Sequence, residues 1–157
     1  MAETAHRAFV VDQRGGNIAL DLFVVDQHLA ALLDAALAGT GVTAALFAVY
    51  SQLARGPRTP GRLCATLGVR PTTLSGHLAT MERNGHTAKT RSPVDGRSFT
   101  VSLTDAGLAK VRECRPLVQR AMRVVNTEVG SADDVAAARA VIARIDDAIQ
   151  LARGRLR

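Results

Sequence analysis

The sequence predicts a mainly α-helical chain with one small β-hairpin. Along most of its 157 residues, apolar side chains recur every three or four positions, as on one face of a helix. Between residues 87 and 103 the pattern changes to two runs rich in β-branched residues, joined by a turn that contains Pro93 and Gly96. A short helix with a small polar face comes directly before this hairpin. Together these features predict a winged helix-turn-helix flanked by helices at both ends.

The predicted recognition helix has Pro71 in its first turn and two unlike faces. Leu74, Leu78 and Met81 form an apolar row at spacings of four and three residues. Such a helix can pack on a core by its apolar face and enter a DNA major groove by the other. The residues opposite the apolar row are small, hydroxylated or basic: Thr72, Ser75, Gly76, Ala79 and Arg83.

The predicted hairpin has strands over Thr87–Arg91 and Ser98–Leu103. Pro presets φ and Gly accepts positive φ, so the residues between the strands have the chemistry of a turn. Arg97 follows this turn and gives the hairpin a basic tip. Lys89 and Arg91 add further positive charge along the first strand.

Helices are expected over residues 17–38, 43–55, 59–68, 104–129 and 131–152, around the recognition helix. Thr59 and Pro60 have the chemistry of a helix start, and Ser131 with Asp134 resembles a capping box. The second of these helices is apolar on nearly every side, which predicts burial. Pro116 should kink the long helix over 104–129, or divide it into two shorter helices.

The terminal helices carry apolar rows that a compact helix-turn-helix core leaves uncovered. In the first helix this row advances by alternating steps of four and three, close to a heptad seam. Burial against a second copy would cover such rows, so a homodimer is expected. We expect residues 1–40 and 104–157 to form the dimerisation regions and residues 41–103 the DNA-binding domain. The row of the first helix consists of Ile18, Leu22, Val25, Leu29, Leu32 and Ala36.

Positive charge is concentrated in the middle of the chain. The net charge is +6, and residues 55–97 hold eight basic and two acidic residues, whereas residues 1–54 hold two basic and five acidic ones. This distribution is typical of a surface that contacts double-stranded DNA. The candidates for phosphate contacts are Arg58, Arg62, Arg70, Arg83, Lys89 and Arg91.

Other classes of function find no support in the sequence. The chain has no nucleophile elbow or phosphate-binding glycine loop, so an enzyme is not expected. Cys64, Cys114 and the four His residues have no metal-ligand spacing, and no cofactor or metal is expected. No apolar run approaches the roughly 20 residues of a membrane helix, and the N-terminus lacks the apolar region of a signal peptide. We therefore expect a cytoplasmic protein without membrane contact.

Four segments, in this order and spacing, resemble the MarR family of bacterial transcription regulators. They are GVRPTTLS at 68–75, MERNG at 81–85, DGRS at 95–98 and LTDAG at 103–107. The resemblance extends through the helical flanks over most of the chain. It implies an intertwined homodimer that acts as a ligand-responsive repressor at a pseudo-palindromic operator.

The resemblance also implies roles for residues of the recognition helix and hairpin. Arg97 would enter the minor groove, oriented by Asp95, although an exposed turn ion pair of little consequence is the alternative. Family members often carry a larger residue where this chain has Gly76, so DNA shape would contribute to specificity. The family usually has an aliphatic residue where this chain has His86, so the chain departs from the family pattern just before the first strand. The groove-facing candidates are Thr72, Thr73, Ser75 and Gly76.

Family effectors, often aromatic acids or other phenolics, bind between the dimerisation and DNA-binding lobes. The first two helices would line that cleft here, with Phe23, His28, Phe47 and Tyr50 as candidate contacts, and a core role is the alternative for each. Two other functions stay open. One is an oxidation sensor that uses Cys64 or Cys114, and the other is an architectural protein that binds DNA without sequence preference.

Overall fold

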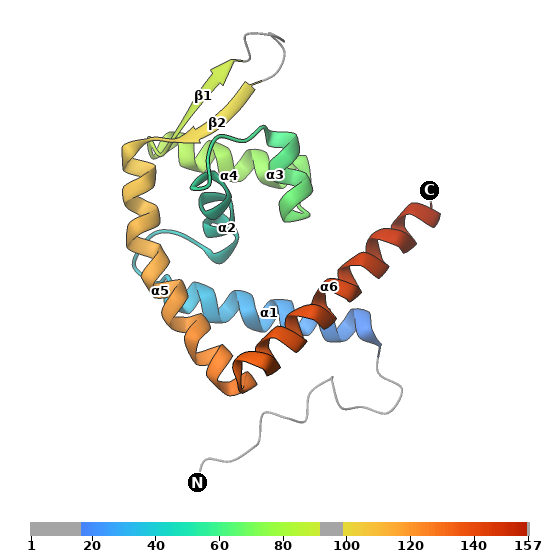
Figure 1. Cartoon of the computed structure of the whole chain (residues 1–157). Coiled ribbons are helices and arrows are strands. Elements are labelled where there is room, and N and C mark those ends of the chain that lie inside the picture. Colours follow the sequence, from blue (N-terminus) through green and yellow to red (C-terminus); the bar gives the residue numbers. More distant parts are fainter. Residues whose placement is uncertain (1–16, 92–98, 157) are drawn as a thin grey trace. The chain divides into compact units, whose positions relative to one another are not determined.

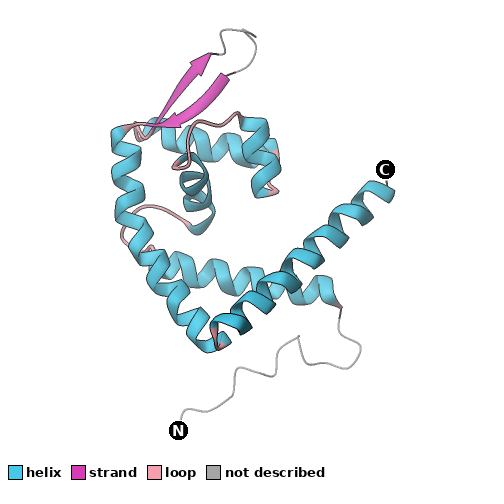
Figure 2. Ribbon diagram, in the orientation of Figure 1, coloured by secondary structure: helices cyan, strands magenta, loops and turns pink. Residues whose placement is uncertain are grey.

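The predicted order of helices and strands is present in the computed structural model, which describes residues 17–91 and 99–156 (Figure 1). The described residues within Met1–Val118 form one compact unit, and those within Gln119–Arg157 form a second. Helices account for most of the described chain (Figure 2). The elements are α1 Ile18–Ala36, α2 Ala44–Leu53, α3 Pro60–Leu67, α4 Pro71–Arg83, β1 Thr87–Arg91, β2 Phe99–Leu103, α5 Asp105–Val129 and α6 Ala132–Arg155.

The chemistry of the helix starts accounts for where several helices begin. The Thr59 hydroxyl accepts a hydrogen bond from the Arg62 N–H at 3.3 Å, with Pro60 in the first turn of α3. The expected capping box before α6 is present. The Asp134 carboxylate accepts the Ser131 N–H at 2.8 Å, and the Ser131 hydroxyl accepts the Asp134 N–H at 3.2 Å. Hydrogen bonds from Ser131 also lower the pKa of Asp134.

Helix α5 is continuous through Pro116, so the alternative of two shorter helices is wrong. Proline removes one backbone N–H donor, which leaves one carbonyl of the preceding turn without its helical partner. Pro116 lies on an exposed face of α5, where water can satisfy this carbonyl. A helix of 25 residues keeps enough turns on either side to propagate past the defect.

The hydrophobic core of the first unit is built around α2, as its all-round apolar sequence predicts. Its buried residues are Leu46, Phe47, Val49, Tyr50 and Leu53. The other elements contribute one apolar face each, with Leu63 from α3, Val101 from β2, and Val111 and Cys114 from α5. Because α4 adds Leu74, Leu78 and Met81 to the same cluster, this core fixes the helix that we expect to contact DNA.

Strands β1 and β2 pair antiparallel, with Thr87 opposite Leu103 and Arg91 opposite Phe99. The loop between α2 and α3 adds an isolated bridge on the other side of β2. The Arg58 N–H donates to the Val101 carbonyl at 3.0 Å, and the Val101 N–H donates to the Arg58 carbonyl at 2.8 Å. Sequence periodicity cannot reveal this bridge, because it involves a single residue of the loop.

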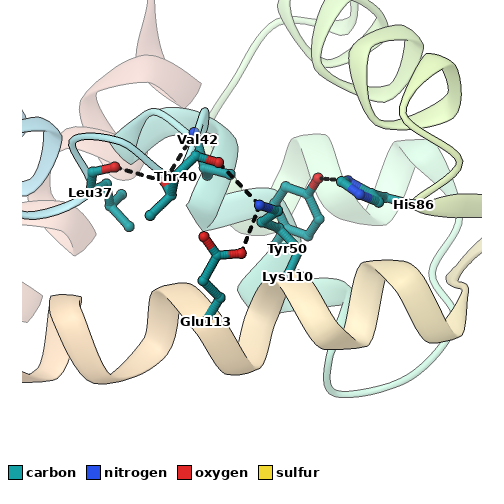
Figure 3. Close-up of polar contacts among 7 residues, drawn as sticks. All are labelled: Leu37, Thr40, Val42, Tyr50, His86, Lys110 and Glu113. Atoms are coloured by element: carbon teal, nitrogen blue, oxygen red, sulfur yellow. Dashed lines mark hydrogen bonds and ion pairs between the residues drawn. The ribbon is translucent and has the colours of Figure 1, made fainter.

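A polar cluster joins α5 to the turn between α1 and α2 (Figure 3). The Lys110 ammonium donates to the Thr40 carbonyl at 3.1 Å and forms an ion pair with Glu113 at 2.7 Å. The Thr40 hydroxyl donates to the Leu37 carbonyl at 2.7 Å and accepts the Val42 N–H at 3.2 Å. These contacts tie the segment that leads into α2 to the N-terminal half of α5.

The apolar row of α1 is not buried. This helix has no buried residue, and the exposed fractions of Ile18, Val25 and Leu29 are 59%, 52% and 39%. Helix α6, in the second unit, likewise buries none of its residues, and Ile142 and Ile149 are among its exposed apolar side chains. Within residues 17–91 and 99–156, no helix has the length and apolar character needed to span a membrane.

Candidate nucleic-acid interface

Helices α3 and α4 form the helix-turn-helix. Gly68 ends α3 with a φ of +66°, a left-handed conformation that favours glycine, and Pro71 starts α4 three residues later. The apolar row of α4 is buried as predicted, with 1% of Leu74, 7% of Leu78 and none of Met81 exposed. The opposite face of α4 therefore points away from the core.

The groove-facing candidates all lie on exposed positions of α4. They are Thr72, Thr73, Ser75 and Gly76. A Cβ built on Gly76 meets no atom within 4 Å, so packing does not require glycine there. The missing side chain lowers the surface of α4 at this point, which permits a closer approach of another molecule to the helix backbone.

Basic side chains surround this face. Arg70, Arg83, Lys89 and Arg91 are exposed, and the Arg83 guanidinium donates to the Thr80 hydroxyl at 3.2 Å. Arg62 is exposed as well, whereas Arg58 is half-buried. Asp95 and Arg97, the pair expected at the tip of the hairpin, lie outside the described residues.

An ion pair between α4 and β1 was missed by the sequence reasoning. Oε2 of Glu82 lies 2.7 Å from Nζ of Lys89, and this ammonium is 5.8 Å from the centre of the Phe99 ring. Lys89 therefore has an acidic neighbour as well as an aromatic one. The signal for it was the isolated Glu82 in a basic stretch, but the approach of α4 to β1 does not follow from spacing along the chain.

His86 connects β1 to the core beneath it (Figure 3). Its Nδ1 atom is hydrogen-bonded to the buried Tyr50 hydroxyl at 2.6 Å, and the two rings are tilted at 59°. Strand β1 begins at Thr87, as predicted. Where the resembled family usually has an aliphatic residue, this chain thus has an imidazole with a specific polar partner.

The backbone around His86 joins α4, β1 and α5. The His86 N–H donates to the Met81 carbonyl at 2.9 Å, and the Thr104 N–H donates to the His86 carbonyl at 3.1 Å. The Thr104 hydroxyl donates to the Gly85 carbonyl at 2.7 Å and accepts the Gly107 N–H at 3.2 Å. A Cβ at Gly107 would collide with the His86 carbonyl, which explains the glycine in LTDAG.

The four effector candidates occupy two different environments. Phe23 and His28 are exposed on α1, with an exposed fraction of 60% for Phe23. Phe47 and Tyr50 are buried in the core, and burial raises the pKa of Tyr50 to about 12. A cavity of about 520 Å³ lies elsewhere, between α3, α4 and the hairpin. Pro60, Cys64, Leu74, Ser75, Lys89 and Phe99 are among its lining residues.

The two cysteines differ in accessibility. Cys114 is fully buried, and its burial raises the pKa of the thiol. Cys64 is half-buried on α3. Among the described residues, no three His, Cys, Asp or Glu side chains gather as a metal site would require.

Helix α4 buries one face, follows α3 and is followed by a β-hairpin. This arrangement defines a winged helix-turn-helix protein. The model of the MarR family matches residues 40–98, and no curated protein matches the chain. The matched segment resembles a family whose members are transcriptional regulators and not enzymes. The resemblance to this family and the predicted fold class are thereby confirmed.

Solved structures extend the similarity over most of the chain. A transcriptional regulator of M. tuberculosis, MOSR, in complex with DNA is 26% identical with a TM-score of 0.76, covering 87% of this chain and 98% of that one. A variant of E. coli MarR with operator DNA is 26% identical with a TM-score of 0.74, covering 82% and 92%. The repressor CouR, bound to a DNA duplex, is 27% identical with a TM-score of 0.74, covering 83% and 92%.

Proposed function

We propose that this chain is a repressor that binds a pseudo-palindromic operator as a homodimer and leaves it when a small molecule binds. The observation that carries the proposal is the division of α4 into a buried apolar face and an exposed face of small polar residues. A helix fixed in this way by its core can lie in the major groove without disturbing its own packing.

DNA would be contacted by α4 and the hairpin. Thr72, Thr73, Ser75 and Gly76 would face the bases, and phosphates would be contacted by the surrounding basic side chains. Arg97, oriented by Asp95, would enter the minor groove from the hairpin tip. The phosphate contacts in this proposal are Arg70, Arg83, Lys89 and Arg91.

The dimer would form through residues 1–40 and 104–157, and residues 41–103 would bind DNA. The exposed apolar row of α1 supports this division, because a soluble monomer seldom exposes such a continuous apolar surface. A two-fold dimer would place two α4 helices about 34 Å apart, one turn of DNA. Light scattering at micromolar concentration tests this step, and a monomer would contradict it.

An aromatic or phenolic effector would act by favouring one separation of the two DNA-binding regions. Phe23 and His28 are accessible contacts on α1, whereas Phe47 and Tyr50 could take part only if the core opened. The Lys110 contacts to the α1–α2 turn offer a route by which a change near α1 reaches α5.

An oxidation sensor on the same fold is the second candidate, favoured by the half-buried position of Cys64 beside a cavity. Cys114 suits this role poorly, because a buried thiol with a raised pKa forms little of the reactive thiolate. If peroxide changes the DNA binding of the wild type and of Cys114→Ser but not that of Cys64→Ser, the second candidate is supported.

Fluorescence anisotropy with DNA from directly upstream of the chain's own gene tests the main proposal. We expect this DNA to bind about a thousandfold more tightly than a random duplex, with a steep dependence on salt. Equal affinity for every duplex selected from a random pool would instead favour an architectural protein.

A further inference from the structure

Glu82 interrupts the basic surface around α4. Between residues 55 and 91 the sequence has seven basic residues and this single acidic one. Its carboxylate forms the 2.7 Å ion pair with Lys89 that joins the last turn of α4 to β1. Both side chains are exposed to a similar extent, 45% for Lys89 and 52% for Glu82, so DNA can reach the pair.

The ion pair changes what Lys89 can contribute to DNA binding. Loose, sequence-independent binding depends on the summed charge that a surface presents to the phosphates. Glu82 cancels the charge of Lys89 in this sum. The pair would therefore contribute little to the affinity for a random duplex on which no phosphate is fixed next to the hairpin.

An operator bound in its specific position differs from a random duplex, because its phosphates are fixed relative to Lys89. An ammonium has three N–H donors, and one carboxylate oxygen at 2.7 Å occupies only one of them. A phosphate held at a fixed position beside β1 can accept from a second donor while Glu82 keeps the first. Phe99 lies beside the same ammonium and adds a further restraint on its position.

We propose that Glu82 is a specificity-determining residue of the DNA interface. It neutralises Lys89 toward phosphates that are not fixed in place, and it holds the Lys89 ammonium ready for the one phosphate that the operator places beside β1. This inference rests on the proposed DNA-binding function. It extends that function by assigning discrimination between DNA sequences to a residue that need not contact a base.

The test compares full-length Glu82→Gln with the wild type on two duplexes at several salt concentrations. One duplex is the tightest binder selected from a random pool, and the other is an unselected random sequence. We expect Glu82→Gln to bind the random duplex about fivefold to tenfold more tightly at 0.1 M salt, with a log–log salt slope steeper by about 0.9. Operator affinity should change less than about twofold, so the ratio between the two affinities falls.

Two further variants separate this role from a general effect of charge. Glu113→Gln breaks the Lys110 ion pair on α5, which has the same 2.7 Å distance, and removes the same charge. It should leave the affinity ratio unchanged. In a Lys89→Gln background, adding Glu82→Gln should no longer lower the ratio. Far-UV circular dichroism confirms that each variant is folded.

Three results would overturn the inference while leaving the proposed function intact. An unchanged ratio in Glu82→Gln is the first, and an equal fall of the ratio in Glu113→Gln is the second. The third is weaker operator binding with unchanged random binding, which would make Glu82 a structural brace between α4 and β1. A wild type that shows no preference among selected duplexes would overturn the proposed function together with the inference.

Discussion

Helices α4 and α1 carry similar apolar rows but differ in what covers them. Leu74, Leu78 and Met81 of α4 are almost completely buried, whereas Leu29 and Leu32 of α1 are 39% and 40% exposed. The two rows have nearly the same spacing along the chain. Periodicity therefore identifies the face of a helix that needs a partner, but it does not show whether the partner belongs to the same chain.

The largest effect is expected from shortening an apolar side chain on α4. Leu74→Ala should lower the free energy of unfolding by about 2–5 kcal/mol, because it leaves a cavity in a closed core. Chemical denaturation of the purified protein measures this change. Thr73→Ala, at the neighbouring exposed position, is the matched control and should alter stability by less than about 0.5 kcal/mol. Similar losses in both variants would contradict the burial of α4.

A charge in the apolar row of α1 tests the other half of the comparison. Leu29→Glu should dissociate the proposed dimer and weaken operator binding by about a hundredfold, because the two halves of the operator would then be bound independently. Light scattering and anisotropy measure the two effects. Gln27→Glu adds the same charge to the side of α1 opposite Leu29 and should change neither. If Leu29→Glu were still a dimer, the dimer interface would have to be formed by another surface.

A smaller effect is expected from the hairpin that follows α4, whose tip we propose to contact DNA. Arg97→Ala should weaken operator binding at least about tenfold, or roughly 1.4 kcal/mol, through loss of the minor-groove contact. Arg153→Ala removes the same charge from the exposed end of α6 and serves as the control in the anisotropy measurement. Unchanged binding in Arg97→Ala would exclude the hairpin tip from the mechanism.

The smallest effect concerns the hydrogen bond beneath the hairpin. Tyr50→Phe keeps the core filled but removes the partner of His86 Nδ1, and it should cost about 1 kcal/mol of stability. Its pH dependence gives a second readout. Burial raises the pKa of Tyr50 from 10.0 to about 12 and also raises that of Cys114 from 9.0.

Both groups therefore keep their protons to a higher pH in the folded protein than in the unfolded chain. Their contribution to stability is complete below pH 9 and falls as the pH rises toward 12. Denaturation between pH 8 and pH 11 should show this decline in the wild type and a shallower one in Tyr50→Phe. An equal decline in both proteins would mean that the Tyr50 phenol is not the group responsible.

Local features of the fold could be predicted because local chemistry determines them. Thr59 with Pro60, and Ser131 with Asp134, mark helix starts within four residues of sequence. Contacts between distant residues could not be predicted in this way. The pairing of Glu82 with Lys89, of Tyr50 with His86 and of Arg58 with Val101 depends on how α2, α4 and the hairpin pack.

The exposed face of α4, which carries the residues proposed to contact DNA, was predictable as a class. Exposure of Thr72 and Ser75 follows from the burial of Leu74 and Leu78, since a helix that packs on a core by its apolar face leaves the opposite, polar face outside. The pairing of Lys89 with Glu82 was not predictable, because it depends on the angle between β1, which carries Lys89, and α4, which carries Glu82. The alternative of two helices divided at Pro116 was wrong because an exposed face tolerates the missing hydrogen bond.

The bridge between Arg58 and Val101 bears on how the hairpin can vary in length. Val101 pairs with Lys89 on one side and with Arg58 on the other, so the base of β2 is held between two neighbours. A slip of β2 along β1 would change this register, break the two hydrogen bonds with Arg58 and bring the buried Val101 into water. Residues inserted or deleted between Arg91 and Phe99 would leave this attachment in place. The distance that the hairpin extends toward a DNA duplex can therefore change without changing how β2 is attached to the rest of the protein.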